Sequence, residues 1–158
     1  MANIFAGSEV VEIGIQIEKN GRDFYNTLAG KTRKPKAAEL FIFLAQEEEK
    51  HILAFQGILN KAEHLEPQGL DADQYYAYMN ALASGYIFTQ KDKGAEIAKT
   101  IKADIDAVDA GIGFEKESIV FYEGIKQVVP PHDHKIIDEL IVQEESHLRK
   151  LLDLKKAL

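Results

Sequence analysis

Apolar residues recur along this chain at the three- and four-residue spacing of one helix face, in four long segments. These segments predict helices over residues 8–29, 35–64, 103–128 and 132–157. No segment alternates apolar and polar residues for long enough to predict a β-strand. The pattern therefore predicts an all-α fold built on four long helices.

The ends of these helices carry local signals. Ser8 is placed to cap the first helix, and Gly30 follows its last apolar residue as a stop signal. Pro35 suits the first turn of the second helix, and Pro130 with Pro131 ends the third. We therefore expect the helices to begin and end close to these residues.

The second and third helices are separated by residues 65–102, far more than the short loop that joins antiparallel neighbours. Within this connection, residues 71–83 predict a short helix, and residues 94–104 predict another that could run into the third long helix. A long crossover lets the second and third helices run parallel. The sequence therefore predicts a ferritin-like four-helix bundle, with residues 1–158 as one domain.

The third predicted helix repeats part of the first. Residues 14–25 read GIQIEKNGRDFY and residues 111–122 read GIGFEKESIVFY, with six of the twelve positions identical. The identical positions include Glu18 and Glu115, each inside the apolar stripe of its helix. Because a carboxylate is costly to bury without a partner, the repeat indicates two equivalent functional positions.

A Glu-x-x-His motif follows each copy on the next helix, Glu48 with His51 and Glu144 with His147. Because a helix turns about 100° per residue, the Glu and His of each motif lie on one face, one turn apart. One such motif is weak evidence, since 16 of the 158 residues are Glu. Both motifs, however, follow the matched glutamates of the repeat, by 30 and 29 residues, and this register argues against chance.

Antiparallel packing brings the repeated residues to one height. Each isolated Glu stands about a dozen residues before its helix ends, and each motif about a dozen after the next begins. We therefore expect six side chains to converge: Glu18, Glu48, His51, Glu115, Glu144 and His147. Two divalent cations would neutralise the four carboxylates, which are unfavourable to bury as unpaired charges. Oxygen and imidazole ligands without sulfur suit iron or manganese and tolerate zinc.

Two tyrosines share the register of the isolated glutamates. Tyr25 and Tyr122 lie seven residues after Glu18 and Glu115, and seven residues return to within about 20° of the same direction. Each phenol is therefore expected to point into the interior, where it could hydrogen-bond a metal-binding carboxylate. The alternative is a buried tyrosine satisfied by any nearby acceptor.

The other histidines are weaker candidates. His132 and His134 flank Asp133 before the fourth helix and are interpreted as solvated cap residues, with a surface metal site as the alternative. His64 stands at the end of the second helix without a ligand partner in register. The crossover aromatics are expected to pack onto the bundle; they are Tyr75, Tyr76, Tyr78, Tyr86 and Phe88.

Composition narrows the class of protein. The net charge is −7, without a basic run, so nucleic acid and anionic membranes are not expected as partners. There is no apolar stretch long enough to span a membrane and no signal-peptide pattern, so a cytoplasmic location is expected. The absence of cysteine excludes disulfides, thiolate metal sites and cysteine nucleophiles. Any metal must be held by His and carboxylate.

The motifs IEKxxxxFY, EEExH, FEKxxxxFY and QEExH resemble the rubrerythrin branch of the ferritin-like superfamily, most closely the short forms that lack the rubredoxin domain. The resemblance implies two iron ions held by the six residues named above, with manganese or zinc as substitutes, and no catalytic residue beyond this centre. It also implies reduction of peroxide, or oxidation of Fe(II) by oxygen or peroxide, in oxidative-stress defence. A homodimer is the family expectation.

The sequence departs from classical rubrerythrins in two places. The family carries a further Glu three residues after the isolated Glu of the third helix, but here Ser118 occupies that position. No Cys-x-x-Cys pair is present, so electrons would come from a separate donor protein. Three interpretations remain: a redox enzyme, an iron or manganese carrier without efficient turnover, and an interaction bundle with a vestigial site.

Overall fold

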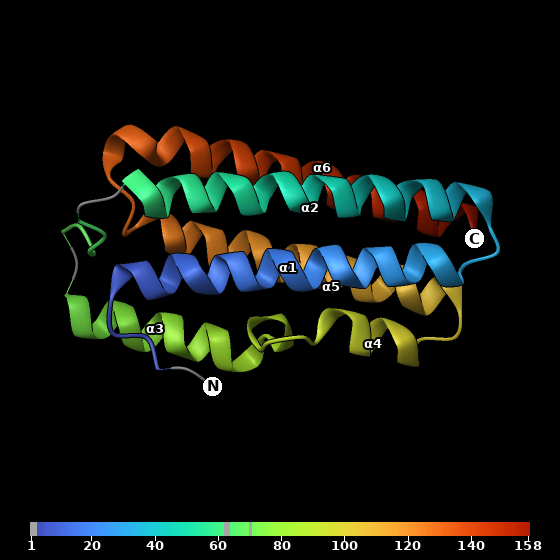
Figure 1. Cartoon of the computed structure of the whole chain (residues 1–158), viewed down its shortest axis with the longest axis horizontal. Helices are drawn as coiled ribbons and strands as arrows, with labels where there is room; N and C mark the ends of the chain where they lie inside the picture. Colours follow the sequence, from blue (N-terminus) through green and yellow to red (C-terminus); the bar gives the residue numbers. More distant parts are fainter. Residues whose placement is uncertain (1–2, 62–63, 70) are drawn as a thin grey trace.

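The computed structural model describes residues 3–61, 64–69 and 71–158. Four long helices run side by side along the molecule (Figure 1). They are α1 (Gly7–Lys31), α2 (Pro35–Lys61), α5 (Asp104–Lys126) and α6 (His134–Ala157). The described residues contain no β-strand, which confirms the predicted all-α fold.

The long helices are joined by the predicted crossover topology. Helix α1 packs on α2 and α5 on α6, while α1 also contacts α5 and α2 contacts α6. Figure 1 shows that α2 and α5 point the same way and that every packed pair of long helices is antiparallel. This is the ferritin-like arrangement, in which the two helix pairs can present equivalent residues at one height.

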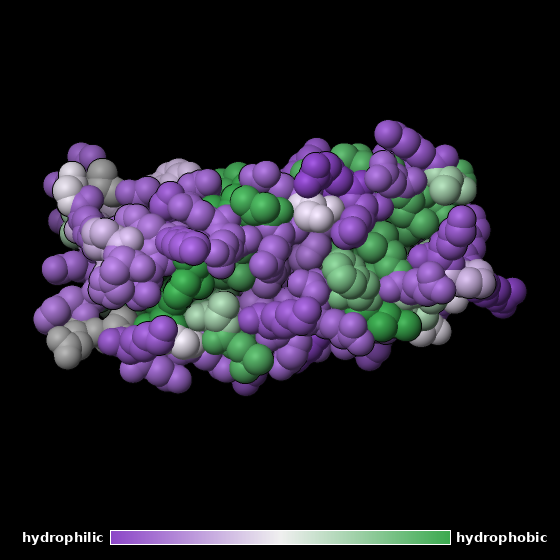
Figure 2. Space-filling model, turned by 90° about the horizontal axis from the view of Figure 1, so that it is seen from above, coloured by the Kyte–Doolittle hydropathy of each residue, from purple (hydrophilic) through white to green (hydrophobic). Residues whose placement is uncertain are grey.

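The crossover covers one side of the bundle. It contains α3 (Ala72–Gly85), the short 3₁₀ helix η1 (Ile87–Thr89) and α4 (Gly94–Thr100). Helix α4 and η1 lie against α1, and α3 lies against α5. The outer side of α2 and α6 therefore remains free of the crossover. From above, the surface is mostly hydrophilic with separate apolar patches (Figure 2).

The buried side chain of Asn20 attaches the crossover to α1 by four hydrogen bonds. The amide nitrogen of Asn20 donates to the carbonyls of Phe88 and Gln90, both at 2.6 Å. Its oxygen accepts the backbone N–H groups of Lys93 and Gly94, both at 2.9 Å. A Cβ on Gly94 would stand 1.9 Å from the carbonyl oxygen of Asn20, so this close approach requires glycine. Asn20 thus satisfies loop groups that would otherwise be buried without partners.

The first helix does not begin and end as predicted. Helix α1 begins at Gly7, with Ala6 as its N-cap residue and no side-chain cap, so the Ser8 cap was wrong. A Cβ on Gly7 would stand 2.1 Å from the carbonyl oxygen of Leu65, which shows that packing against the crossover governs this end. Helix α1 also continues one residue past Gly30, to Lys31.

The short helix at residue 94 does not continue into α5. Helix α4 ends at Thr100 and residues 101–103 separate it from α5. The ammonium group of Lys31 donates to the carbonyls of Ala98 at 2.8 Å and Lys99 at 3.0 Å, and also to that of Ile101. These are carbonyls at a helix C-terminus, which a cation stabilises.

The remaining helix ends differ less. Helix α2 extends to Lys61, and residues 62–63 of its predicted span lie outside the described residues. The fourth helix was predicted from residue 132, but Pro131–Asp133 form a 3₁₀ turn and α6 begins at His134. Helix α5 ends at Lys126, two residues before the predicted limit. No helix among the described residues is both long and apolar enough to cross a membrane.

Candidate metal centre

The structure brings all six residues of the predicted constellation together inside the bundle. Helices α1 and α5 each contribute one Glu, and α2 and α6 each contribute a Glu-x-x-His pair. The four carboxylates are fully buried, and the two imidazoles are at most 2% exposed. The residues are Glu18, Glu48, His51, Glu115, Glu144 and His147. The structure therefore brings together the six side chains that the helix register was expected to bring together.

These residues form two overlapping groups. Glu18 and His51 lie with Glu48 and Glu144 in one group, and within it the potential ligand atoms are all within 4.8 Å of one another. The second group contains the same two carboxylates with Glu115 and His147, within the same limit. Glu48 and Glu144 therefore belong to both groups, whereas each His and each isolated Glu belongs to one. Such sharing would let Glu48 and Glu144 help to hold each of two cations.

The buried polar atoms of the site lack ordinary partners. Eight buried side-chain nitrogen and oxygen atoms of the described residues have no hydrogen-bond partner, and all eight belong to these six residues. They include both oxygens of Glu48, both oxygens of Glu144 and the Nδ1 atoms of His51 and His147. Buried polar groups are normally paired. The orphaned lone pairs therefore fit a metal-binding cavity, because cations would satisfy them.

The proton affinities of these groups reflect crowding in a dry interior. Burial and repulsion from Glu144 raise the pKa of Glu48 and of Glu115 well above the ordinary range. Burial opposes the charge on His51, but the carboxylates of Glu18 and Glu144 outweigh it and raise its pKa to about 11. Burial also opposes the charge on Glu144, but the neighbouring Glu115 and His51, whose Nδ1 lies 2.6 Å from Glu144 Oε1, lower its pKa to about 2. The site therefore holds protons where cations would otherwise balance the charge.

Each tyrosine of the repeat contacts the isolated Glu of the other copy. The Tyr25 hydroxyl donates to Glu115 Oε1 at 2.7 Å, and the Tyr122 hydroxyl donates to Glu18 Oε1. Both rings are fully buried. Burial raises the pKa of both phenols well above the usual value, so they remain donors. The hydrogen bonds to carboxylates are thus present, but they cross between α1 and α5.

The two imidazoles have different outer contacts. Nε2 of His51 lies 2.7 Å from Gln143 Oε1, a contact that suits an Nε2–H donor and leaves Nδ1 facing the carboxylates. The ring of His147 instead meets the edge of Phe43 at a centroid distance of 6.0 Å. Burial lowers the pKa of His147, which favours its neutral, ligand-competent form. Gln143 was not predicted, although it directly precedes Glu144 in the QEExH motif.

No carboxylate occupies the position of a seventh ligand. Ser118 is fully buried, and its hydroxyl donates to the carbonyl of Phe114 in its own helix at 2.9 Å. The equivalent position in the first copy is Gly21, where a Cβ would stand 2.5 Å from Phe114 Cζ and 3.2 Å from Glu48 Oε2. Ser118 thus has its hydroxyl hydrogen-bonded within its own helix, and the absence of a side chain at Gly21 leaves room for the ring of Phe114. The set remains at four carboxylates and two imidazoles.

The weaker candidates lie outside this cluster. The His132 side chain is 78% exposed, and His134 Nε2 contacts the carbonyl of Val129 at 2.8 Å. Of the crossover aromatics, Tyr75 and Phe88 are buried as expected, but Tyr78 is 52% exposed. The prediction that all of these aromatics pack onto the bundle was therefore wrong for Tyr78.

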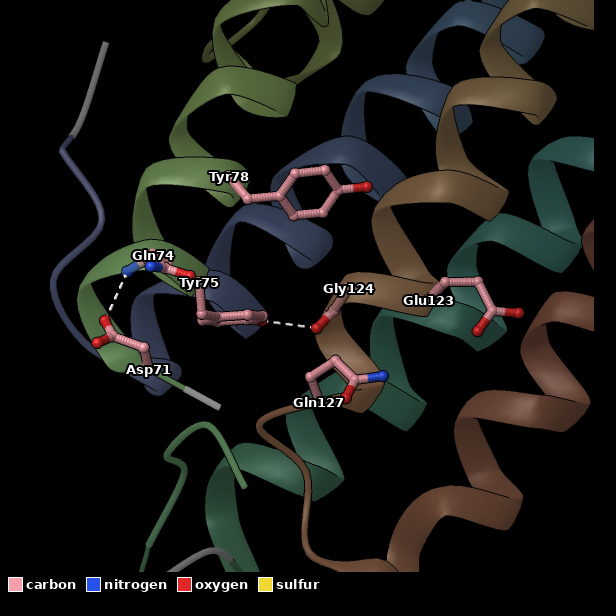
Figure 3. Close-up of a pocket in the computed structure, with 7 residues that line it drawn as sticks. All are labelled: Asp71, Gln74, Tyr75, Tyr78, Glu123, Gly124 and Gln127. Carbon is pink, nitrogen blue, oxygen red and sulfur yellow. Dashed lines mark hydrogen bonds between the residues drawn. The ribbon is translucent and has the colours of Figure 1, made fainter. Parts of the chain in front are cut away.

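A pocket between α3 and α5 is separate from this centre (Figure 3). Its volume is about 370 Å³, and Tyr75 and Tyr78 contribute to its wall. The Tyr75 hydroxyl donates to the carbonyl of Gly124 at 2.6 Å, and Asp71 accepts the backbone N–H of Gln74 at 3.0 Å (Figure 3). These contacts attach α3 to α5 and cap α3.

Comparison with known proteins agrees with this architecture. The family model described as Rubrerythrin matches residues 9–155. A crystal structure from Thermotoga maritima, described as that of a ferritin-like diiron-carboxylate protein, superposes with a TM-score of 0.68 at 23% identity, covering 99% of this chain and 98% of the other. A hypothetical protein from Pyrococcus furiosus gives a TM-score of 0.66 at 17% identity, covering 96% and 89%. No curated protein matches the sequence.

Proposed function

We propose that this chain, which belongs to the rubrerythrin family, binds two iron ions at the six-residue centre. We further propose that it is an oxidoreductase, in which the bound Fe(II) reacts with hydrogen peroxide or oxygen. The observation that carries the proposal is the pair of overlapping ligand groups sharing Glu48 and Glu144. A centre for one ion would not need two such groups. The description of the Thermotoga maritima protein as a diiron-carboxylate protein supports the same choice of metal.

The chain's own residues would perform four tasks at this centre. The four carboxylates would balance the charge of two divalent ions, and Nδ1 of each His would supply one further ligand. Tyr25 and Tyr122 hold the isolated glutamates in orientation. The surrounding apolar core excludes bulk water, which strengthens the electrostatic interactions within the site. Iron supplies the electrons that reduce the oxidant.

The proposal is tested by anaerobic loading with Fe(II), followed by rapid mixing with peroxide or oxygen. We expect two Fe(II) per chain and fast oxidation, followed by further cycles when a reductant is added. The matched variant is Glu144→Gln, with Glu145→Gln as the control, because Glu145 is the exposed neighbour of Glu144. Oxidation should be lost in the first and retained in the second. Equal oxidation in both variants would show that the centre is not where the reaction occurs.

A second candidate function is an iron or manganese carrier without efficient turnover. It is favoured by Ser118, whose hydroxyl is turned back to its own helix instead of supplying a carboxylate, and by the absence of cysteine for electron transfer. The same loading experiment separates the two functions. Bound metal that is inert to both oxidants but is released to a chelator would favour the carrier.

Two partners belong to the redox proposal. A separate electron-donor protein would supply reducing equivalents, because the chain has no cysteine with which to bind an iron–sulfur centre that could pass electrons to the di-iron centre. The protein would act as a homodimer, as the family resemblance implies. Sedimentation measures the oligomeric state directly. Turnover with purified small redox proteins as reductants tests the first partner, and turnover supported only by a chemical reductant would argue against it.

A further inference from the structure

A cavity lies between α1, α5 and the crossover, against the metal-binding centre. Its volume is about 160 Å³. Two of its lining residues directly precede residues of the centre in the chain, since Phe24 precedes Tyr25 and Phe114 precedes Glu115. Other lining residues include Phe88, Ile97, Gly113 and Glu117. The cavity therefore lies between the crossover and the two helices that carry Glu18 and Glu115.

One aromatic ring separates the cavity from the centre. Phe114 lines the cavity, and its Cζ lies 2.5 Å from the point where a Cβ on Gly21 would stand. Glu48 Oε2 lies 3.2 Å from that same point, so ring and carboxylate are close neighbours. The Phe114 ring also packs against Phe88, with centroids 4.8 Å apart, on the cavity side. The Phe114 ring therefore both lines the cavity and lies close to a carboxylate of the centre.

The cavity wall is almost wholly apolar. Aromatic and aliphatic side chains form most of it, and Glu117, which is half-buried, is the one carboxylate among the lining residues. An apolar cavity of about 150 Å³ can bind benzene or xenon. This cavity, of similar size, therefore suits a small apolar molecule.

The two candidate oxidants differ in their affinity for such surroundings. Dioxygen is apolar and can leave water without losing strong hydrogen bonds. Hydrogen peroxide has two hydroxyl groups, and a transfer into an unpaired apolar site costs it hydrogen bonds with water. The wall offers only one side chain that could replace those hydrogen bonds. The lining chemistry thus favours dioxygen over peroxide.

We infer that this cavity binds dioxygen and admits it past Phe114 to the metal-binding carboxylates, which rests on the proposed function for the reaction that follows. The attachment of the crossover at Asn20 keeps the cavity in place, because Asn20 bonds the carbonyl of Phe88 in its wall. Peroxide, being polar, would lose hydrogen bonds with water in this cavity, so we expect it to reach the centre by another path. The inference thus separates the two oxidants by their path to the same centre.

The cavity can be filled without disturbing the helix around it. A Cβ built on Gly113 meets no atom within 4 Å, so Gly113→Phe places a ring at the cavity without a backbone clash. Gly57→Phe is the matched control, because Gly57 is also in a long helix, is half-buried and meets no atom within 4 Å. Ala110→Leu is a second filling variant, since Ala110 also lines the cavity. Neither glycine change should destabilise its helix, as glycine is itself a poor helix former.

The binding test uses xenon and requires no iron. Diffraction from crystals of the metal-free protein under xenon pressure should show xenon between Phe24, Phe88 and Phe114. The xenon should be absent in Gly113→Phe and present in Gly57→Phe. An empty cavity in the wild-type protein, or xenon of equal occupancy in Gly113→Phe, would overturn the inference.

The delivery test compares the two oxidants on the Fe(II)-loaded protein. Gly113→Phe should slow oxidation by dioxygen several-fold and leave oxidation by peroxide close to that of wild type, while Gly57→Phe changes neither. Equal slowing with both oxidants, or no slowing with dioxygen, would overturn the route. If the wild-type protein reacts with neither oxidant, the proposed function fails, and so does the role of the cavity in delivering dioxygen. Xenon bound in the cavity would still show that it is a binding site for small apolar molecules.

Discussion

The two halves of the bundle present the same ligands in different surroundings. Helices α1 and α2 contribute Glu18, Glu48 and His51, and α5 and α6 contribute the equivalent set of two Glu and one His. The outer nitrogen of His51 is bonded by Gln143, whereas the ring of His147 meets the edge of an aromatic side chain. The repeat therefore produces equivalent ligands without producing equivalent environments.

The difference extends to the equivalent positions beside the glutamates. Asn20 in the first copy makes four hydrogen bonds to the crossover, while its counterpart Glu117 borders the apolar cavity. The crossover packs mainly against α1 and α5, so it breaks the symmetry of the bundle on one side. If the centre binds two ions as proposed, the two ion positions should therefore differ in affinity and in access.

The largest expected effect separates shared from unshared carboxylates. Glu48→Gln should abolish tight binding at both positions, because this side chain belongs to both ligand groups. Glu18→Gln should abolish binding at one position only, since Glu18 belongs to a single group. Isothermal titration with Fe(II) under anaerobic conditions measures the stoichiometry. If Glu18→Gln and Glu48→Gln lose the same number of ions, the division into shared and unshared ligands is wrong.

The anchoring of the crossover should depend on one copy of the repeat. Asn20→Ala removes four hydrogen bonds and leaves buried backbone groups of the crossover unpaired, so unfolding should become easier by about 3 kcal/mol. Glu117→Ala, at the equivalent position, should change stability by less than about 0.5 kcal/mol, because the half-buried Glu117 has no such anchoring role. Urea denaturation of both variants checks the contrast. Similar losses would show that the two copies anchor the structure equally.

The outer contact of His51 should tune one ion position. Gln143→Ala removes the contact to Nε2, and the loss of such a partner lowers metal affinity by about 10- to 100-fold. The equivalent residue on α2 is Glu47, whose carboxylate pairs with Lys50 at 2.8 Å, so Glu47→Ala should have a smaller effect. Competition with a calibrated chelator measures both affinities. A uniform drop at both positions in Gln143→Ala would contradict the assignment.

The smallest expected effect is the change in stability of the metal-free protein with pH. Glu48 and Glu115 have raised pKa values in the folded chain, so they keep protons that the unfolded chain releases above pH 4.5. His51, with a pKa of about 11, likewise keeps a proton that the unfolded chain releases above pH 6.5. These groups therefore contribute less stability as pH rises. The lowered pKa of Glu144, about 2, contributes stability that is complete above 4.5 and lost on acidification towards 2.

The metal-free protein should consequently be most stable in mildly acidic solution and become less stable above pH 6.5. Added Fe(II) or Mn(II) should flatten this decline, because metal ions replace the retained protons and bind more tightly at higher pH. Denaturation at several pH values, with and without metal, checks the slope. A metal-free protein whose stability rises with pH above 6.5 would be inconsistent with protons held at this centre.

Much of the centre could be predicted from local sequence rules. Helical periodicity places Glu48 and His51 on one face, and the matched spacing brings Glu18 level with them. The sequence could not show which carboxylates are shared, because this depends on how α2 and α6 pack. It could not identify Gln143 as the partner of His51 for the same reason.

Some local signals were overridden by contacts distant in sequence. Ser8 carries the chemistry of a cap, but the close packing of Gly7 on Leu65 begins the helix earlier. The helix at residue 94 has no breaker before residue 104 in the sequence, yet Lys31 from α1 binds the carbonyls at its C-terminus. Both of these corrections arise where the crossover packs against α1, a contact that the spacing of apolar residues cannot predict.

The central claim is that two iron ions share Glu48 and Glu144 inside the bundle. Anomalous diffraction at the iron edge from crystals loaded anaerobically with Fe(II) tests it directly. We predict two peaks in the buried site, one beside Glu18 and His51 and the other beside Glu115 and His147, with Glu48 and Glu144 contacting both. A single peak in the site, or iron bound only outside these six residues, would contradict the account.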